Sequence, residues 1–176
     1  MVAELKYTKP LIYLHWIMLV VIVIAFAAME FRGIFPKGSE ERMLMKLVHY
    51  SAGFTVLALL GVRIFFRISR QAPAIRPEPS KQTILMAKLM HLMLYIIMLL
   101  MPISGWLLLS AEGQPIFAFG LSVPSLIDQN NNLAHTVESV HETMAVIAYV
   151  FIGLHALFGL LHHYVKKDNT LQRMLP

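Results

Sequence analysis

The sequence predicts an all-α membrane protein, a four-transmembrane-helix bundle with both termini cytoplasmic. Its composition, four long apolar runs and the placement of its basic residues lead to this prediction. The 176-residue chain is 57% hydrophobic and 14% charged, and its mean hydropathy is +0.64. A soluble domain averages about 45–50% apolar and about 25% charged residues. Length alone would allow one soluble domain, but this composition indicates a protein of the lipid bilayer.

The four apolar runs cover residues 10–29, 43–66, 84–110 and 140–164. Each supplies the ~20 residues that a helix needs to cross ~30 Å of hydrocarbon. The polar segments between them are too short to bury a core of their own. We therefore expect a single four-helix transmembrane domain over residues 1–176 and no separate soluble domain.

The ends of the runs carry the signals expected of helix boundaries. Pro10 suits a helix start, because the missing N–H of proline costs little there. Gly33 and Pro36 mark a turn after the first run, and prolines fill the connection from 67 to 81. Residues 112–138, with the run QNNN, are expected to form a longer polar loop.

The basic residues predict the orientation, because cytoplasmic loops are enriched in lysine and arginine. Eleven of the fifteen lie at the N-terminus, around the second connection and in the C-terminal tail. Four flank the first connection and none lies in the last. Both termini should therefore face the cytoplasm. The net charge of +5 is then explained by topology, and no nucleic-acid partner is expected.

The chain contains no cysteine, which excludes disulfides, iron–sulfur clusters, covalent c-type haem and thiol catalysis. The first apolar run lacks a small-residue cleavage site and is long enough to span a membrane. No cleavable signal peptide is therefore expected.

Seven of the eight histidines lie in or beside the apolar runs, where ionisable residues are rare and usually functional. His49 and His141 share the outer depth, and His15 and His155 share the inner depth. His141 and His155 are fourteen residues apart on one helix, which is ~21 Å of rise and returns to nearly the same face. Neutral imidazole is a common metal ligand. These four residues are therefore the candidate axial ligands of two haem b groups held in the bundle core.

The remaining histidines suggest a quinone site at the inner end. His91 and His162 could exchange hydrogen bonds and protons with a quinone headgroup, although bridging between helices is nearly as good an explanation. For His163, an interfacial position is the better explanation. Arg63 and Arg67 are candidates to pair with haem propionates, but the orientation rule alone also explains them.

Several segments together resemble the bacterial cytochrome b561 family of four-helix, di-haem membrane proteins. They include HWIMLV, MEFRGIFP, LVHYSAGF, GQPIFAFG and HETMAVIAYVFIGLHALFGLLHHY, and they extend along nearly the whole chain. The ending HHYVKKDNTLQRMLP is similar to the superoxide oxidase branch of the inner membrane. The family ligand pattern falls on His15, His49, His141 and His155.

The resemblance implies a superoxide:ubiquinone oxidoreductase of the bacterial inner membrane. Superoxide would be oxidised on the periplasmic side and ubiquinone, the electron acceptor, reduced near the cytoplasmic side. Arg32 and Lys37 could attract the superoxide anion to the outer end, against the opposing charge of nearby glutamates. Membrane lipid, quinone and superoxide are the expected partners, and no obligate soluble protein partner is expected.

Two other functions remain open from the sequence. The chain could be a membrane cytochrome b anchor that relays electrons between a dehydrogenase or hydrogenase partner and quinone. It could also be a binding or structural four-helix protein without redox function, but its histidines would then be coincidental.

Overall fold

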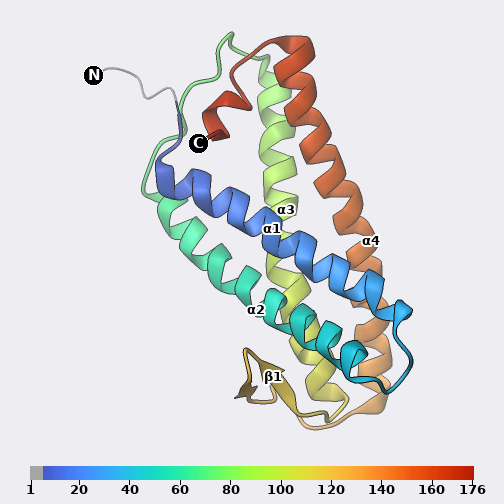
Figure 1. Ribbon diagram of the computed structural model, residues 1–176. Coiled ribbons are helices and arrows are strands. Elements are labelled where there is room, and N and C mark those ends of the chain that lie inside the picture. Colours follow the sequence, from blue (N-terminus) through green and yellow to red (C-terminus); the bar gives the residue numbers. More distant parts are fainter. Residues whose placement is uncertain (1–5) are drawn as a thin grey trace.

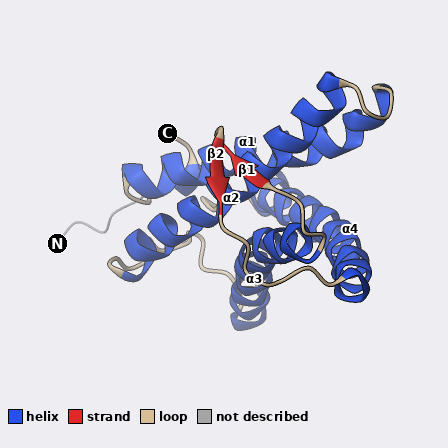
Figure 2. Cartoon of the chain, turned by 90° about the horizontal axis from the view of Figure 1, so that it is seen from below, coloured by secondary structure: helices blue, strands red, loops and turns tan. Residues whose placement is uncertain are grey.

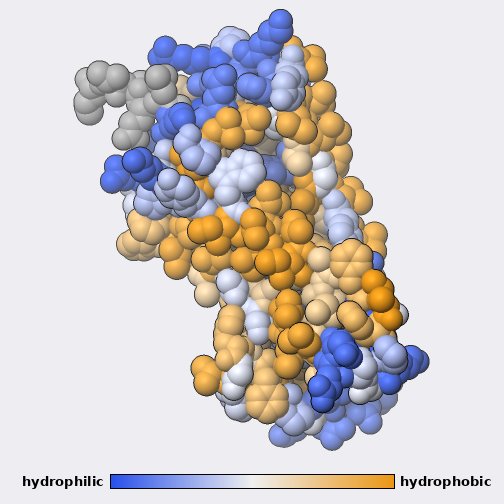
Figure 3. All heavy atoms as spheres, in the orientation of Figure 1, coloured by the Kyte–Doolittle hydropathy of each residue, from blue (hydrophilic) through white to orange (hydrophobic). Residues whose placement is uncertain are grey.

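Four long helices make up most of the structure, a computed structural model that describes residues 6–176 (Figure 1). They are α1 (Lys9–Phe31), α2 (Glu40–Ile68), α3 (Lys81–Ala111) and α4 (Asn131–Leu161), and a π-helical turn over His162–Lys166 continues α4. Each of the four is long and apolar enough to cross a membrane. The surface supports this, because hydrophobic side chains form a broad band between two polar ends (Figure 3). The predicted bundle of four membrane-length helices is confirmed, and the cytoplasmic location of both termini stays a prediction.

Three helices begin at a polar residue whose side chain accepts a hydrogen bond from a backbone N–H in the first turn. Ser39 does this for α2, Ser80 for α3 and Asn130 for α4. Such caps satisfy N–H groups that have no partner within the helix. The cap at Asn130 corrects the prediction of a loop as far as residue 138. The run QNNN starts a helix there because asparagine is a strong N-cap residue.

The remaining part of the expected loop contains a short β-hairpin, which was not predicted from the sequence. Strand β1 (Ile116–Ala118) pairs antiparallel with β2 (Leu121–Val123). Phe119 and Gly120, with φ of 55° and 76°, make the two-residue turn, and positive φ at both positions is typical of a type I′ hairpin turn. The backbone N–H of Phe119 donates to Ser51 Oγ at 3.0 Å, so the hairpin is tied to α2.

The helices associate as two antiparallel pairs. Helix α1 packs along α2 and α3 packs along α4, while the two pairs meet mainly through α2 and α3. Figure 1 shows the pairs leaning across one another, and Figure 2 shows the hairpin lying across one end. We call this the hairpin end. Because α1 and α4 contact each other little, space remains between the pairs.

Both ends of the described chain lie at the opposite end of the bundle, which we call the terminal end. The Tyr7 N–H donates to the Arg173 carbonyl at 3.1 Å, and the Trp16 indole N–H donates to the Met174 carbonyl at 2.8 Å. The tail therefore folds back over the start of α1. Arg173 is buried in this contact, with 7% of its surface exposed.

Candidate functional site

The space between the helix pairs is a cavity of 1320 Å³ that extends from one end of the bundle to the other. It reaches Tyr7 and Arg173 at the terminal end and Arg32 and Glu112 at the hairpin end. A pocket for one small molecule usually measures about 300–1,000 Å³, so this cavity has room for more than one group. Six of the histidines singled out from the sequence line it: His15, His49, His91, His141, His155 and His162.

At the hairpin end, His49 of α2 and His141 of α4 face each other. Their ring centroids are 6.2 Å apart and their planes are inclined at 78°. Two imidazoles on opposite sides of one metal ion, with metal–nitrogen bonds of about 2.0–2.1 Å, would place their centroids about 6.3 Å apart. The pair therefore has the spacing that one bis-histidine haem requires.

Hydrogen bonds orient both rings of this pair. His49 Nδ1 lies 2.9 Å from the Ala25 carbonyl oxygen, and His141 Nδ1 lies 2.9 Å from Ser104 Oγ. With Nδ1 occupied, Nε2 is the nitrogen left to bind a metal, as in many histidine metal sites. Gly105 lets His141 lie close to α3, because a Cβ at that position would be 3.3 Å from His141 Cε1.

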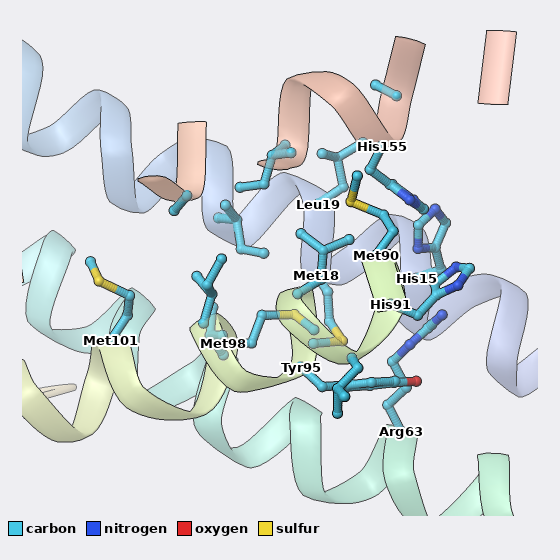
Figure 4. Close-up of a pocket in the computed structure, with 18 of the residues that line it drawn as sticks. His15, Met18, Leu19, Arg63, Met90, His91, Tyr95, Met98, Met101 and His155 are labelled. Carbon is cyan, nitrogen blue, oxygen red and sulfur yellow. The ribbon is translucent and has the colours of Figure 1, made fainter. Parts of the chain in front are cut away.

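At the terminal end, His15 of α1 and His155 of α4 form a second pair. Their ring centroids are 6.1 Å apart and their planes are inclined at 77°, so this pair also has the spacing for one bis-histidine haem. His91 of α3 lies nearer still to His155, at 5.4 Å between centroids, which is shorter than the about 6.3 Å that an intervening iron would need. Figure 4 shows these three rings gathered on one side of the cavity, with Arg63 of α2 beside them.

The structure also places the two arginines predicted to pair with propionates. Arg63 and Arg67 both line the cavity near the terminal end. Arg63 donates through Nη1 to the Leu11 carbonyl at 3.1 Å, and Arg67 donates to the Arg70 carbonyl at 3.2 Å. Each guanidinium has further N–H groups, so both side chains could also bind an anionic group in the cavity.

The two candidate quinone residues differ in their partners. His91 Nδ1 lies 2.7 Å from the Ala87 carbonyl oxygen, one turn earlier in α3. His162 Nδ1 lies 2.5 Å from Asp168 Oδ2. The structure thus brings His91 beside the terminal-end pair, whereas His162 is attached to the C-terminal tail.

At the hairpin end, Arg32 and Lys37 border a separate hollow of 360 Å³ together with Arg42 and Lys46. Arg42 donates to the carbonyls of Arg32 and Phe35 at 3.2 and 3.1 Å and so holds this loop in shape. Glu30, one of the opposing acidic residues, accepts a hydrogen bond from Tyr149 at 2.9 Å. The four cations make the hollow suited to an anion.

Four residues of the site were not predicted from the sequence: Ser104, Gly105, Asp168 and Arg173. Ser104 and Gly105 carry no signal of their own, because serine and glycine are common in membrane helices. Asp168 could have been noticed as an acidic residue that follows the HHYVKK segment at a helix end. Arg173 is explained only by the folding back of the tail.

Comparison with known proteins identifies the family of this chain. Residues 6–176 match the family model described as "Prokaryotic cytochrome b561". The chain is 41% identical to "Cytochrome b561 homolog 1" of Escherichia coli strain K12, over 97% of each chain. It is 39% identical to "Probable superoxide oxidase CybB" of Yersinia pestis, over 97% of this chain and 96% of the relative.

A second Escherichia coli relative, "Cytochrome b561 homolog 2", is 33% identical over 73% of this chain and 69% of its own length. The family match, the four membrane-length helices and the histidine-lined cavity agree with one another. The chain belongs to the prokaryotic cytochrome b561 family: it is a bacterial multi-pass membrane protein that binds haem b and transfers electrons.

Proposed function

We propose that this chain is a superoxide:ubiquinone oxidoreductase of the bacterial inner membrane. Superoxide would be oxidised at the hairpin end, on the periplasmic side, and ubiquinone reduced near the terminal end, on the cytoplasmic side. The observation that carries this proposal is the pair of matched histidine sites at the two ends of one cavity. The similarity to a relative named as a probable superoxide oxidase supports the choice of donor.

His49 with His141, and His15 with His155, are the residues that would hold two haem b groups. Haem b bound between two imidazoles supplies an iron couple that accepts and donates one electron at a time. The hydrogen bonds of His49 and His141 hold their Nε2 atoms available. Arg63 and Arg67 would neutralise carboxylates at the terminal end, since guanidinium forms strong charge-assisted hydrogen bonds with them.

The whole chain, residues 1–176, would form one transmembrane domain with both termini in the cytoplasm. The positions of the basic residues support this orientation, and Tyr7 and Arg173 lie together at the terminal end. Alkaline phosphatase is active only outside the cytoplasm. An active fusion of this enzyme to the C-terminus would reverse the orientation and the assignment of substrates to the two ends.

At the hairpin end, the chain contributes positive charge that would attract an anionic substrate. Arg32 and Lys37, with the other cations of the 360 Å³ hollow, would raise the local concentration of an anion such as superoxide. One-electron oxidation of superoxide releases O₂ and needs no proton. A basic surface beside the outer histidine pair is therefore sufficient at this end.

At the terminal end, the chain must handle protons. One ubiquinone takes up two electrons, supplied by two superoxide ions, and two protons from the cytoplasmic side. His91 and His162 would bind the headgroup and deliver protons, because both line the cavity and an imidazole can donate a proton from one ring nitrogen and accept one at the other.

Stopped-flow mixing of the purified, quinone-loaded protein with superoxide tests this function. We expect rapid appearance of the reduced b-type spectrum, followed by its decay as ubiquinol forms. If superoxide leaves the spectrum unchanged while a co-purifying dehydrogenase or hydrogenase subunit reduces the chain, the chain is a membrane anchor and the proposal fails.

A further inference from the structure

A buried carboxylate is bonded to the histidine at the end of α4. Asp168 Oδ2 lies 2.5 Å from His162 Nδ1, and the two side chains are 4% and 20% exposed. The pair joins the π-helical turn to the tail across a bend at Lys167, whose φ is 55°. Burying a charged carboxylate is costly unless it is paired. His162 is the pairing group here, so the two residues form one unit.

The surroundings hold Asp168 in its charged form. The backbone N–H of Thr170 donates to Asp168 Oδ1 at 2.8 Å. Although burial acts to raise the pKa of Asp168, the hydrogen bonds from Thr170 and His162 lower it below its usual value. A carboxylate only accepts hydrogen bonds. His162 Nδ1 must therefore carry the proton of this contact, and Nε2 is the nitrogen left for a ligand.

The part of the cavity beside His162 contains a further donor without a partner. Arg173 Nε is buried and makes no hydrogen bond within the described residues, although Nη1 of the same guanidinium donates to the Pro73 carbonyl. Arg173 and Thr170 line the cavity with His162. A buried donor left without an acceptor is destabilising. A group with oxygen atoms bound beside His162 would supply that acceptor.

We propose that Asp168 is a positioning residue that acts through His162 to deliver a proton to the quinone; this inference rests on the proposed function. Asp168 fixes the tautomer of His162 and stabilises its doubly protonated form. His162 Nε2–H gives its proton to a quinone oxygen that gains electrons from the reduced protein. The neutral ring keeps its Nδ1–H bond to Asp168, and Nε2 regains a proton from cytoplasmic water. His162 thereby supplies one of the two protons taken up by each quinone.

The test separates the quinone step from superoxide chemistry. Full-length protein with its haem is reduced with stoichiometric dithionite and mixed with increasing ubiquinone-1, and reoxidation is followed by absorbance. Asp168→Asn keeps a similar shape but removes the charge. We expect it to retain the b-type spectrum and to reoxidise about tenfold or more slowly at saturating quinone, with little change in the concentration that gives half the maximal rate.

Three further variants show whether Asp168 acts through His162. His162→Gln should slow reoxidation to a similar degree, and the double variant should be no slower than either single variant, because the two residues act as one unit. Asn169→Ala is the matched control. It removes the hydrogen bonds to Arg76 N and Ala74 O that attach the tail elsewhere, and it should reoxidise like the wild type.

The proposal is overturned if Asp168→Asn reoxidises at the wild-type rate, or if the two effects multiply in the double variant. It is also overturned if Asn169→Ala is as slow as Asp168→Asn, since attachment of the tail would then be the cause. If Asp168→Asn loses its haem, His162→Gln still tests the proposal. Reoxidation of His162→Gln at the wild-type rate would show that His162 is not the proton donor. Failure of superoxide to reduce the wild type would count against the proposed function alone, since dithionite replaces superoxide in this assay.

Discussion

The two histidine pairs have almost the same spacing but very different surroundings. Ring centroids are 6.2 Å apart at the hairpin end and 6.1 Å apart at the terminal end. At the hairpin end, both rings are held through Nδ1 by Ala25 and Ser104. At the terminal end, a third histidine, His91, lies 5.4 Å from His155. The hairpin-end site is therefore built to hold one group in a fixed position.

The terminal-end site is surrounded by groups that can move protons or bind charge. Arg63, His91, His162 and Arg173 all line the cavity on that side. Superoxide oxidation needs only an electron path and attraction of an anion, whereas quinone reduction also needs protons. Under the proposed function, the difference between the two ends corresponds to this difference in chemistry, and substitutions at each end should separate the two reactions.

The largest effect is expected from removal of a proposed axial ligand. His141→Ala and His155→Ala should each lower the haem content from two per chain to one, because the two pairs are ~21 Å apart along α4 and bind independently. The pyridine haemochrome assay measures this content. Retention of two haems in both variants would show that the ligand pairs are assigned wrongly.

The second-largest effect is expected from His91, the third histidine at the terminal end. His91→Ala should keep both haems and still allow superoxide to reduce them, while reoxidation by ubiquinone slows about tenfold or more, as expected for loss of a proton-handling group. Stopped-flow absorbance separates the two phases. Loss of one haem would instead make His91 a ligand in place of His15.

A smaller effect, on haem affinity, is expected from the hydrogen bond that orients His141. Ser104→Ala removes the partner of Nδ1, and we expect an affinity loss of about tenfold, the low end of the range for loss of such a partner. The variant should release haem from the hairpin end faster when a haem acceptor is present. Thr143→Ala is the control, because its hydroxyl bonds to the Ser139 carbonyl and not to a ligand. Equal haem loss from both variants would rule out a specific role for Ser104.

The smallest effect is expected from a single side chain at the basic hollow. Lys37→Glu changes the charge by two units, and at about 0.5 kcal/mol or less for each exposed unit it should slow the reduction by superoxide less than about fivefold. Rising ionic strength should reduce the difference from wild type, as salt screens charges over ~8–10 Å. Lys81→Glu, at the terminal end, makes the same charge change away from the hollow. A rate that responds neither to salt nor to Lys37→Glu would leave the hollow without a role.

The four helices and the depth of each histidine were predictable from the sequence. Apolar runs of the length of a bilayer must become helices, because lipid offers no partner to unpaired backbone N–H and C=O groups. A constant rise per residue then converts position in the sequence into depth. Depth alone therefore matches His49 with His141, and His15 with His155. Their role as haem ligands remains a prediction.

The start of α4 and the hairpin were less predictable, because both depend on local hydrogen bonds within a polar segment. The run QNNN is typical of loops, and only the bond from Leu133 N–H to Asn130 marks it as a helix start. The hairpin is held against α2 by Ser51, a residue more than sixty positions earlier in the chain.

The sequence by itself thus determined the number of helices, the depth of the histidines and the family resemblance, because hydrophobicity and helical rise are properties of consecutive residues. Beyond the two histidine pairs that depth already matched, the tertiary structure alone decided which side chains meet at the cavity. Helices α1 and α4 contact each other little, and this leaves the space that the histidines line. The tail folds back to place Asp168 against His162. Such contacts depend on the packing angle of whole helices, which no local pattern of residues specifies.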